Sequence, residues 1–269
     1  MTQYEFKEIL DNSKKPVCFA HRGASSLAFD NSIQALEKAL ALENVRGIEF
    51  DVQQTSDGFL VVHHNFALKI NGHEEWLYNL TLADIRRVYD NKQLPLFEDV
   101  LNLLKSHNKI IDIELKCKGI ARKVIDKCKT INVYSSCILT SIYEEINREI
   151  KEEDSQVARI YGYPRDRGKN LAMKKWTQPL VKAIVVYMKF NLINKVPMIL
   201  KMAETPFISL YHKIISKEVV NFLHDKGAYC ITAIIDLEKN ITDRGASNAI
   251  EKLKDLNVDL IKTDHPQLM

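Results

Sequence analysis

The stretch GIEFDV, residues 47–52, decides the fold, because it places two carboxylates inside a run that otherwise has the pattern of a buried strand. Side chains alternate along a strand, so Glu49 and Asp51 share one face while the apolar residues between them share the other. In a barrel, the apolar face would pack against helices and the acidic face would point into the lumen. The stretch therefore predicts a barrel strand with charge on its inner side.

Short apolar runs of this kind recur along the chain and alternate with amphipathic helical stretches. Strands are predicted at 17–21, 47–52, 110–115, 138–142, 157–162, 207–212, 228–235 and 259–263. Eight strands in alternation with helices predict an α/β fold, a single (β/α)8 TIM-type barrel over residues 1–269. A doubly wound open sheet is the alternative that the same alternation allows.

Composition excludes several classes of protein. The apolar share of 46% and the charged share of 27% are those of a globular protein. The net charge of +3 gives no basic footprint for nucleic acid. Acidic residues occupy the N-terminus where a signal peptide would be apolar, and no run of about 18 apolar residues occurs, so we expect a cytoplasmic protein. Five cysteines without a CxxC pair predict reduced core residues, and the oligomeric state stays open.

Two segments are longer than the connections of a simple barrel require. Residues 53–80 predict a small insertion between the second and third strands, near the mouth of the site. Residues 165–201 carry nine Lys and Arg against one acid, interleaved with aromatic and aliphatic residues. This second segment predicts either a peripheral contact with anionic lipid or a bulky lysophospholipid, or outer helices with solvated lysines and an extra strand at 183–188.

Charged residues gather at the ends of three predicted strands. The third strand, IIDIELK at 110–116, places Asp112, Glu114 and Lys116 on one face. The first strand ends with His21 and Arg22. Barrel active sites lie at the carboxyl ends of the strands, so we expect these groups to converge with the carboxylates of the second strand.

The residue types indicate the chemistry. Carboxylates that converge without cysteine form an all-oxygen site, which suits Mg²⁺, Ca²⁺ or Mn²⁺ better than zinc. The cations Arg22 and Lys116 would repel such a metal unless an anion lay between them, and a phosphate meets that need. Histidines at the same rim would move protons near neutral pH. The residues predict metal-assisted chemistry on a phosphate ester.

Beyond these arguments, the chain resembles the glycerophosphodiester phosphodiesterase family, a group of barrel enzymes, in a series of elements that occur in order. The elements are HRG (21–23), FDNS (29–32), EFDV (49–52), DG (57–58), VVHHN (61–65), PLF (95–97), IELK (113–116) and VDLIKTDHP (258–266). Their order and spacing over nearly the whole chain carry the resemblance.

The resemblance implies a role for individual positions. The implied metal ligands are Glu49, Asp51 and Glu114, the implied phosphate contacts are Arg22 and Lys116, and the implied acid–base pair is His21 and His64. The metal would be Mg²⁺ or Ca²⁺, with Mn²⁺ as an alternative. His63 occupies a variable position of the family pattern, and two adjacent residues of an extended chain point to opposite faces, so we expect only His64 to face the site.

The activity that the resemblance implies is metal-dependent hydrolysis of small glycerophosphodiesters to glycerol 3-phosphate and an alcohol. Two histidines would act as acid and base, through a cyclic glycerol phosphate. The alternatives are a phosphodiesterase of the same fold that acts on lysophospholipids, and a barrel that binds a phosphate ligand without cleaving it. Two departures from the family pattern favour the last alternative: FDNS stands for Pro-Glu-Asn-Thr, and Asn65 stands for an aspartate. A third, ITAII (231–235) for Trp-Thr-Val-Asn, removes an aromatic residue and predicts a different packing of the headgroup or glycerol.

Overall fold

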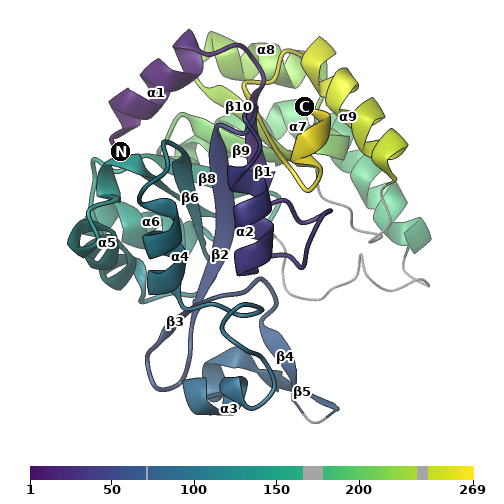
Figure 1. Ribbon diagram of the computed structural model, residues 1–269. Helices are drawn as coiled ribbons and strands as arrows, with labels where there is room; N and C mark the ends of the chain where they lie inside the picture. The colour runs from purple at the N-terminus through teal and green to yellow at the C-terminus, as the bar shows by residue number, and fades with distance from the viewer. Residues whose placement is uncertain (71, 166–177, 235–241) are drawn as a thin grey trace.

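Eight parallel strands form a closed barrel in the computed structural model, which describes residues 1–269 except 71, 166–177 and 235–241 (Figure 1). The barrel strands in order around the sheet are β1 (Val17–His21), β2 (Gly47–Gln54), β6 (Ile110–Leu115), β7 (Cys137–Ser141), β8 (Arg159–Tyr163), β9 (Phe207–Tyr211), β10 (Tyr229–Ile234) and β11 (Leu260–Thr263). Because β1 pairs with both β2 and β11, the sheet has no open edge there. The predicted TIM-type barrel is confirmed, and the open-sheet alternative is wrong.

Helices cover the outside of the barrel. They are α2 (Ile33–Leu40), α4 (Phe97–Leu104), α5 (Ala121–Thr130), α6 (Glu144–Glu153), α7 (Gln178–Ala203), α8 (Lys217–Asp225) and α9 (Asp243–Asp255). The apolar face of β2, with Ile48 and Phe50, packs in the core cluster beneath these helices. This packing leaves the acidic face of β2 pointing inward, as strand alternation requires.

The amino-terminal end of the barrel is closed by α1 (Gln3–Asn12). Phe6 and Leu10 of this helix are fully buried, and the ring centroids of Phe6 and Phe207 lie 4.7 Å apart. All five cysteines are free and four of them are buried, as expected for core residues. The amino-terminal end of the barrel is thus filled with apolar side chains, which leaves the carboxyl ends of the strands for polar groups.

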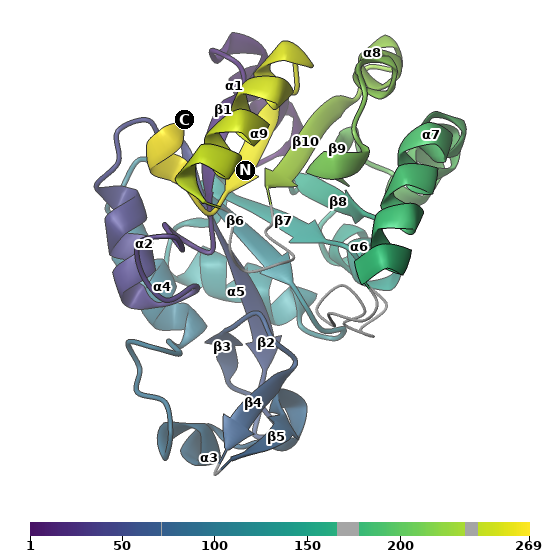
Figure 2. The same ribbon diagram turned by 90° about the vertical axis from the view of Figure 1, so that its right-hand side faces the viewer.

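A small lobe lies between β2 and α4 and projects from the barrel (Figure 2). It contains β3 (Leu60–Val62), the hairpin of β4 (Ala67–Ile70) and β5 (His73–Trp76), and the helices η1 (Leu77–Asn79) and α3 (Leu82–Arg86). The lobe has its own apolar cluster, made by Val61, Leu68, Leu77, Leu80, Ile85 and Leu94. Of the residues expected as an insertion, 53–80, the first two belong to β2, and the described residues after them lie in this lobe, which continues through α3.

The segment 165–201 contains one long helix in its described part. The extra strand considered at 183–188 is wrong, because these residues lie inside α7. Their β-branched residues favour a strand locally, but the connection from β8 to β9 must return along the barrel, and tertiary context overrides the local preference. Among the described helices, only the stretch Lys182–Ala203 is long and apolar enough to cross a membrane by length and composition. Four of the nine basic residues of this segment, those within 166–177, lie outside the described residues.

Candidate active site

Three carboxylates converge at the carboxyl ends of β2 and β6. The parallel register sets Asp51 beside Glu114, and it sets Glu49 beside His21 of β1. One carboxylate oxygen from each of Glu49, Asp51 and Glu114 lies within 4.8 Å of the others. The geometry therefore brings together the three acids that were predicted to hold a metal.

Glu49 is fully buried, and its two oxygens differ in their surroundings. Oε2 accepts a hydrogen bond from the backbone N–H of Arg22 at 2.9 Å, whereas Oε1 is buried without a hydrogen-bond partner. Burial raises the pKa of Glu49 to about 8, and the nearby Asp51 carboxylate adds to the effect. A buried carboxylate oxygen without a partner is costly unless a cation satisfies it. The donor set, all carboxylate oxygen, fits a hard divalent cation such as Mg²⁺ or Ca²⁺.

Asp51 is held by the side chain of Asn31. The Asn31 amide donates to Oδ2 of Asp51 at 2.9 Å, and the backbone N–H of Asp51 donates to Oδ1 of Asn31 at 3.1 Å. Asn31 has a φ of 60°, in the left-handed region that asparagine tolerates better than most residues. Burial raises the pKa of Asp51, but the positive charges of Lys116 and Arg22 outweigh it, so the pKa lies far below its usual range. Asp51 is therefore an oriented, ionised carboxylate.

Two cations, the partly buried Arg22 and the buried Lys116, lie against these acids. The Nε atom of Arg22 is 3.2 Å from Oδ2 of Asp51, and its Nη1 donates to Oδ2 of Asp30 at 3.2 Å. The Nζ atom of Lys116 donates to Oε1 of Glu114 at 3.2 Å and lies 3.4 Å from Oδ1 of Asp51. Burial lowers the pKa of both cations, but the carboxylates outweigh it and raise the pKa above the usual value. Both side chains are thus charged and available to an anion at the same end of the barrel.

His21 is oriented by the carboxylate of Asp264, the residue that follows β11. Its Nδ1 lies 2.7 Å from Oδ1 of Asp264, an oxygen that also accepts from the Ser25 hydroxyl at 2.8 Å. Its Nε2 lies 3.9 Å from Oε2 of Glu49. Burial and Arg22 lower the pKa of His21, but the carboxylates of Glu49 and Asp264 outweigh them and raise it. With Nδ1 engaged, Nε2 is the nitrogen left to exchange a proton with a substrate.

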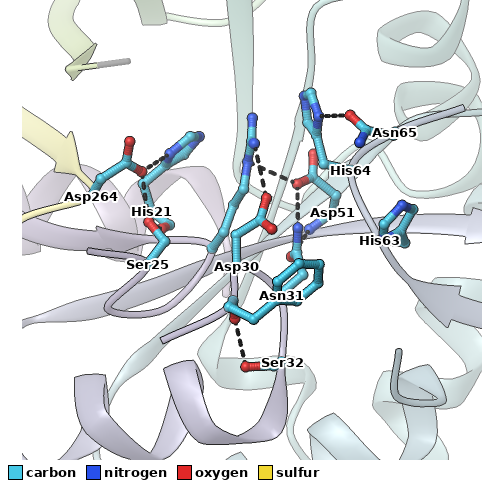
Figure 3. A network of polar contacts seen from close by, with 12 residues as sticks. His21, Ser25, Asp30, Asn31, Ser32, Asp51, His63, His64, Asn65 and Asp264 are labelled. Atoms are coloured by element: carbon cyan, nitrogen blue, oxygen red, sulfur yellow. Dashed lines mark hydrogen bonds and ion pairs between the residues drawn. The ribbon is translucent and has the colours of Figure 1, made fainter. Parts of the chain in front are cut away.

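His64 and His63 take different positions, as expected for adjacent residues. Figure 3 shows the rings of His64 and His21 pointing to the same side of the site, with the His63 ring set apart. Nδ1 of His64 lies 3.0 Å from the amide oxygen of Asn65. Burial, together with Arg22 and Lys116, holds the pKa of His64 well below its ordinary value. His63 is buried, and its Nε2 has no hydrogen-bond partner.

Several groups that hold the site were not among the predicted site residues. They are Ser25, Asp30, Asn31 and Asp264. Asn31 and Asp264 belong to the FDNS and VDLIKTDHP elements, so their place in these elements was the available signal. Asp112, which shares the inner face of β6, has other partners: Nζ of Lys262 lies 2.5 Å from its Oδ2, and the Thr140 hydroxyl donates to its Oδ1 at 2.6 Å. Asp112 is thus paired with other groups inside the barrel, beside Glu49 in the strand register and deeper than Asp51 and Glu114.

Comparisons with known proteins agree with this arrangement. The model of the Glycerophosphoryl diester phosphodiesterase family matches residues 21–268. The chain is 29% identical over 153 residues to a glycerophosphodiester phosphodiesterase of Caldanaerobacter subterraneus subsp. tengcongensis, an alignment that covers 51% of this chain and 63% of that protein. It is 23% identical over 167 residues to human glycerophosphodiester phosphodiesterase 1, covering 56% of this chain and 50% of the relative. The chain thus spans about half to two thirds of the length of these curated relatives.

A solved structure shows the same fold over the whole chain. The Oleispira antarctica phosphodiesterase in complex with the product sn-glycerol-3-phosphate superposes with a TM-score of 0.67 at 18% identity. The match covers 99% of this chain and 97% of the other. At this identity the likeness concerns the fold.

Proposed function

The chain belongs to the glycerophosphoryl diester phosphodiesterase family, and from this premise we propose that it hydrolyses glycerophosphodiesters to glycerol 3-phosphate and an alcohol. The observation that carries the proposal is the convergence of Glu49, Asp51 and Glu114 within 4.8 Å, beside two cations and two histidines. The substrate would be a small molecule, and the cytoplasmic location expected from the sequence is part of the proposal.

Three residues would hold the divalent cation. Glu49, Asp51 and Glu114 supply the oxygen ligands, and Asn31 keeps Asp51 in place from behind. The bound cation would neutralise the phosphodiester and lower the pKa of a nearby glycerol hydroxyl. We expect Mg²⁺ or Ca²⁺, with Mn²⁺ as an alternative.

Arg22 and Lys116 would bind the phosphate. Both lie against Asp51, so an anion that approaches this corner meets two charged donors whose positions are already fixed. The guanidinium offers a planar pair of N–H donors, and the ammonium acts as a point charge. A phosphate held in this way would place its phosphorus atom near the histidines.

The two histidines would transfer the protons of the reaction. One takes the proton of the glycerol 2-hydroxyl as its oxygen forms a bond to phosphorus, and the other protonates the alcohol as its bond to phosphorus breaks. This step gives a cyclic glycerol phosphate and the free alcohol. Water then attacks phosphorus with the roles of His21 and His64 exchanged, and the ring opens to glycerol 3-phosphate. The engaged Nδ1 atoms of both residues leave Nε2 for these transfers.

The first experiment measures release of glycerol 3-phosphate from glycerophosphocholine, glycerophosphoethanolamine and glycerophosphoglycerol, with Mg²⁺, Ca²⁺ or Mn²⁺ and with chelator. His64→Ala should lose about 10²- to 10⁴-fold in kcat. His63→Ala is the matched control, and it should retain most of the activity because the ring lies apart from the site. Folded, metal-loaded protein that cleaves none of these diesters would contradict the proposal and favour a barrel that binds phosphate ligands without cleaving them.

A further inference from the structure

The amino-terminal half of α7 exposes apolar side chains that the proposed chemistry does not use. The exposed fraction is 44% for Ile184, 53% for Val186, 62% for Tyr187 and 76% for Phe190. Among the described side chains from Leu180 to Phe190, none is buried. In Figure 1 this end of α7 reaches away from the strands, at the lower right.

The orientation of these residues on the helix is unusual. Leu192, Val196 and Ile199 are buried and mark the face of α7 that packs on the barrel. Tyr187 and Phe190, three residues apart, lie on the opposite side at 100° per residue. A surface helix ordinarily places polar residues there. The outward face of the amino-terminal half of α7 is therefore apolar, although polar side chains are usual on a face exposed to solvent.

The charges on this helix are all positive. Residues 178–203 contain four lysines and neither aspartate nor glutamate. Lys182 and Lys189, seven residues apart, are exposed on one side of the apolar face. Long lysine side chains lay their methylene stems on apolar surface and carry the ammonium group to its edge. An apolar face bordered by lysines complements an anionic lipid surface, into which the apolar groups insert while the lysines meet the headgroups.

The same end of the barrel carries further exposed apolar groups. Because α7 follows β8, it begins at the carboxyl ends of the strands, where the candidate active site lies. Leu27 and Phe29, in the connection after β1, are 45% and 56% exposed. Phe29 directly precedes Asp30, whose carboxylate accepts a hydrogen bond from Arg22 of the site. Apolar side chains from two separate connections are thus exposed at the end that bears the site.

We propose that this end of the barrel docks on an anionic lipid bilayer through the amino-terminal half of α7. In this proposal α7 lies along the surface of the bilayer and does not cross it, because its second half is packed against the barrel through Leu192, Val196 and Ile199. One consequence rests on the proposed function: the site would then receive glycerophosphodiesters that carry an acyl chain, directly from the lipid surface.

The experiment is co-sedimentation of the full chain with vesicles of mixed phosphatidylglycerol and phosphatidylcholine, compared with phosphatidylcholine alone. We expect binding to the anionic vesicles that weakens as salt is added. Lys182→Gln/Lys189→Gln should lower the affinity by about 30-fold, and Tyr187→Asp/Phe190→Asp should abolish binding. The matched control is Tyr4→Asp/Lys14→Glu, which changes an exposed tyrosine and an exposed lysine near the opposite end of the barrel and should bind like the native chain.

Three results would overturn the docking. They are native binding by Tyr187→Asp/Phe190→Asp, equal loss in the control variant, and a doubled mass in light scattering without vesicle binding, which would assign the face to a second copy. Hydrolysis of glycerophosphocholine, a water-soluble substrate, is measured on the same preparations. Absent docking with intact hydrolysis refutes the docking alone, whereas docking without hydrolysis of any diester refutes the proposed function alone.

Discussion

His21 and Asp264 are 243 positions apart in the chain, yet Nδ1 of His21 lies 2.7 Å from Oδ1 of Asp264. The contact exists because β1 and β11 are neighbours at the closure of the barrel, with Ala20 beside Thr263. The carboxylate fixes the ring and its tautomer, in the way that a histidine used for proton transfer requires.

Asp264→Asn should therefore lower kcat by about 10²-fold while changing KM little, because an amide orients the ring less well and stabilises imidazolium less. The measurement is steady-state kinetics on glycerophosphocholine across pH. Asp243→Asn is the control, since Asp243 contacts His265, which the mechanism does not use. Equal kcat values for Asp264→Asn and the native chain would remove His21 from its assigned role.

Asn31→Gly should weaken binding of the divalent cation by roughly 10- to 100-fold, because Asp51 loses the amide that orients it. Glycine accepts the left-handed φ at this position, so the fold should be retained. Calorimetric titration with Mg²⁺ or Ca²⁺ measures the effect. Asn132→Gly changes another asparagine with positive φ, in the connection from α5 to the amino-terminal end of β7, and should leave the affinity unchanged. The prediction fails if both variants bind the cation like the native chain.

Asn65→Asp tests the departure from the family pattern beside His64. The pKa of His64 is held low by burial and by Arg22 and Lys116, and a carboxylate in place of the amide would raise it. We expect a limb of the pH profile of kcat/KM to move to higher pH, by about one unit. Asn221→Asp adds the same charge on α8 and should not move the profile. An unchanged profile in Asn65→Asp would show that His64 does not govern the rate in this range.

Asp154 should contribute to stability in a pH-dependent way. Partial burial raises the pKa of Asp154, but the Tyr134 hydroxyl, the backbone N–H of Gln156 and the Lys129 ammonium outweigh it, so the pKa lies below the usual 3.8. Because the pKa is lower in the folded state, the ionised Asp154 carboxylate stabilises the fold above pH 3.8. This contribution is lost as the pH falls through the folded-state pKa.

Asp154→Asn should lower the free energy of unfolding by about 1–2 kcal/mol at neutral pH, with a smaller difference in acid. Urea unfolding at several pH values measures it. Asp255→Asn, at an exposed carboxylate on α9, should have an effect within about 0.5 kcal/mol. A deficit in Asp154→Asn that grows as pH falls would have the wrong sign for this explanation.

Local periodicity was enough to predict the barrel. The eight predicted strands all exist, with ends displaced by at most two residues, because short apolar runs that alternate with amphipathic helical stretches are visible in the sequence. The alternation of side chains along a strand placed Glu49 and Asp51 inside. The strand considered at 183–188 was wrong. Its β-branched residues favour a strand locally, but this part of the chain forms the helix that connects β8 to β9.

The sequence by itself determined the barrel strands, the inward carboxylates and the order of the family elements, because each depends on neighbouring residues. Only the tertiary structure decided which of these groups touch: Asp264 on His21, Asn31 on Asp51, and Lys262 on Asp112. It also decided that the amino-terminal half of α7 leaves apolar side chains exposed. These relationships depend on closure of the sheet and on which side of a helix meets the barrel, and distances across the fold leave no period in the sequence.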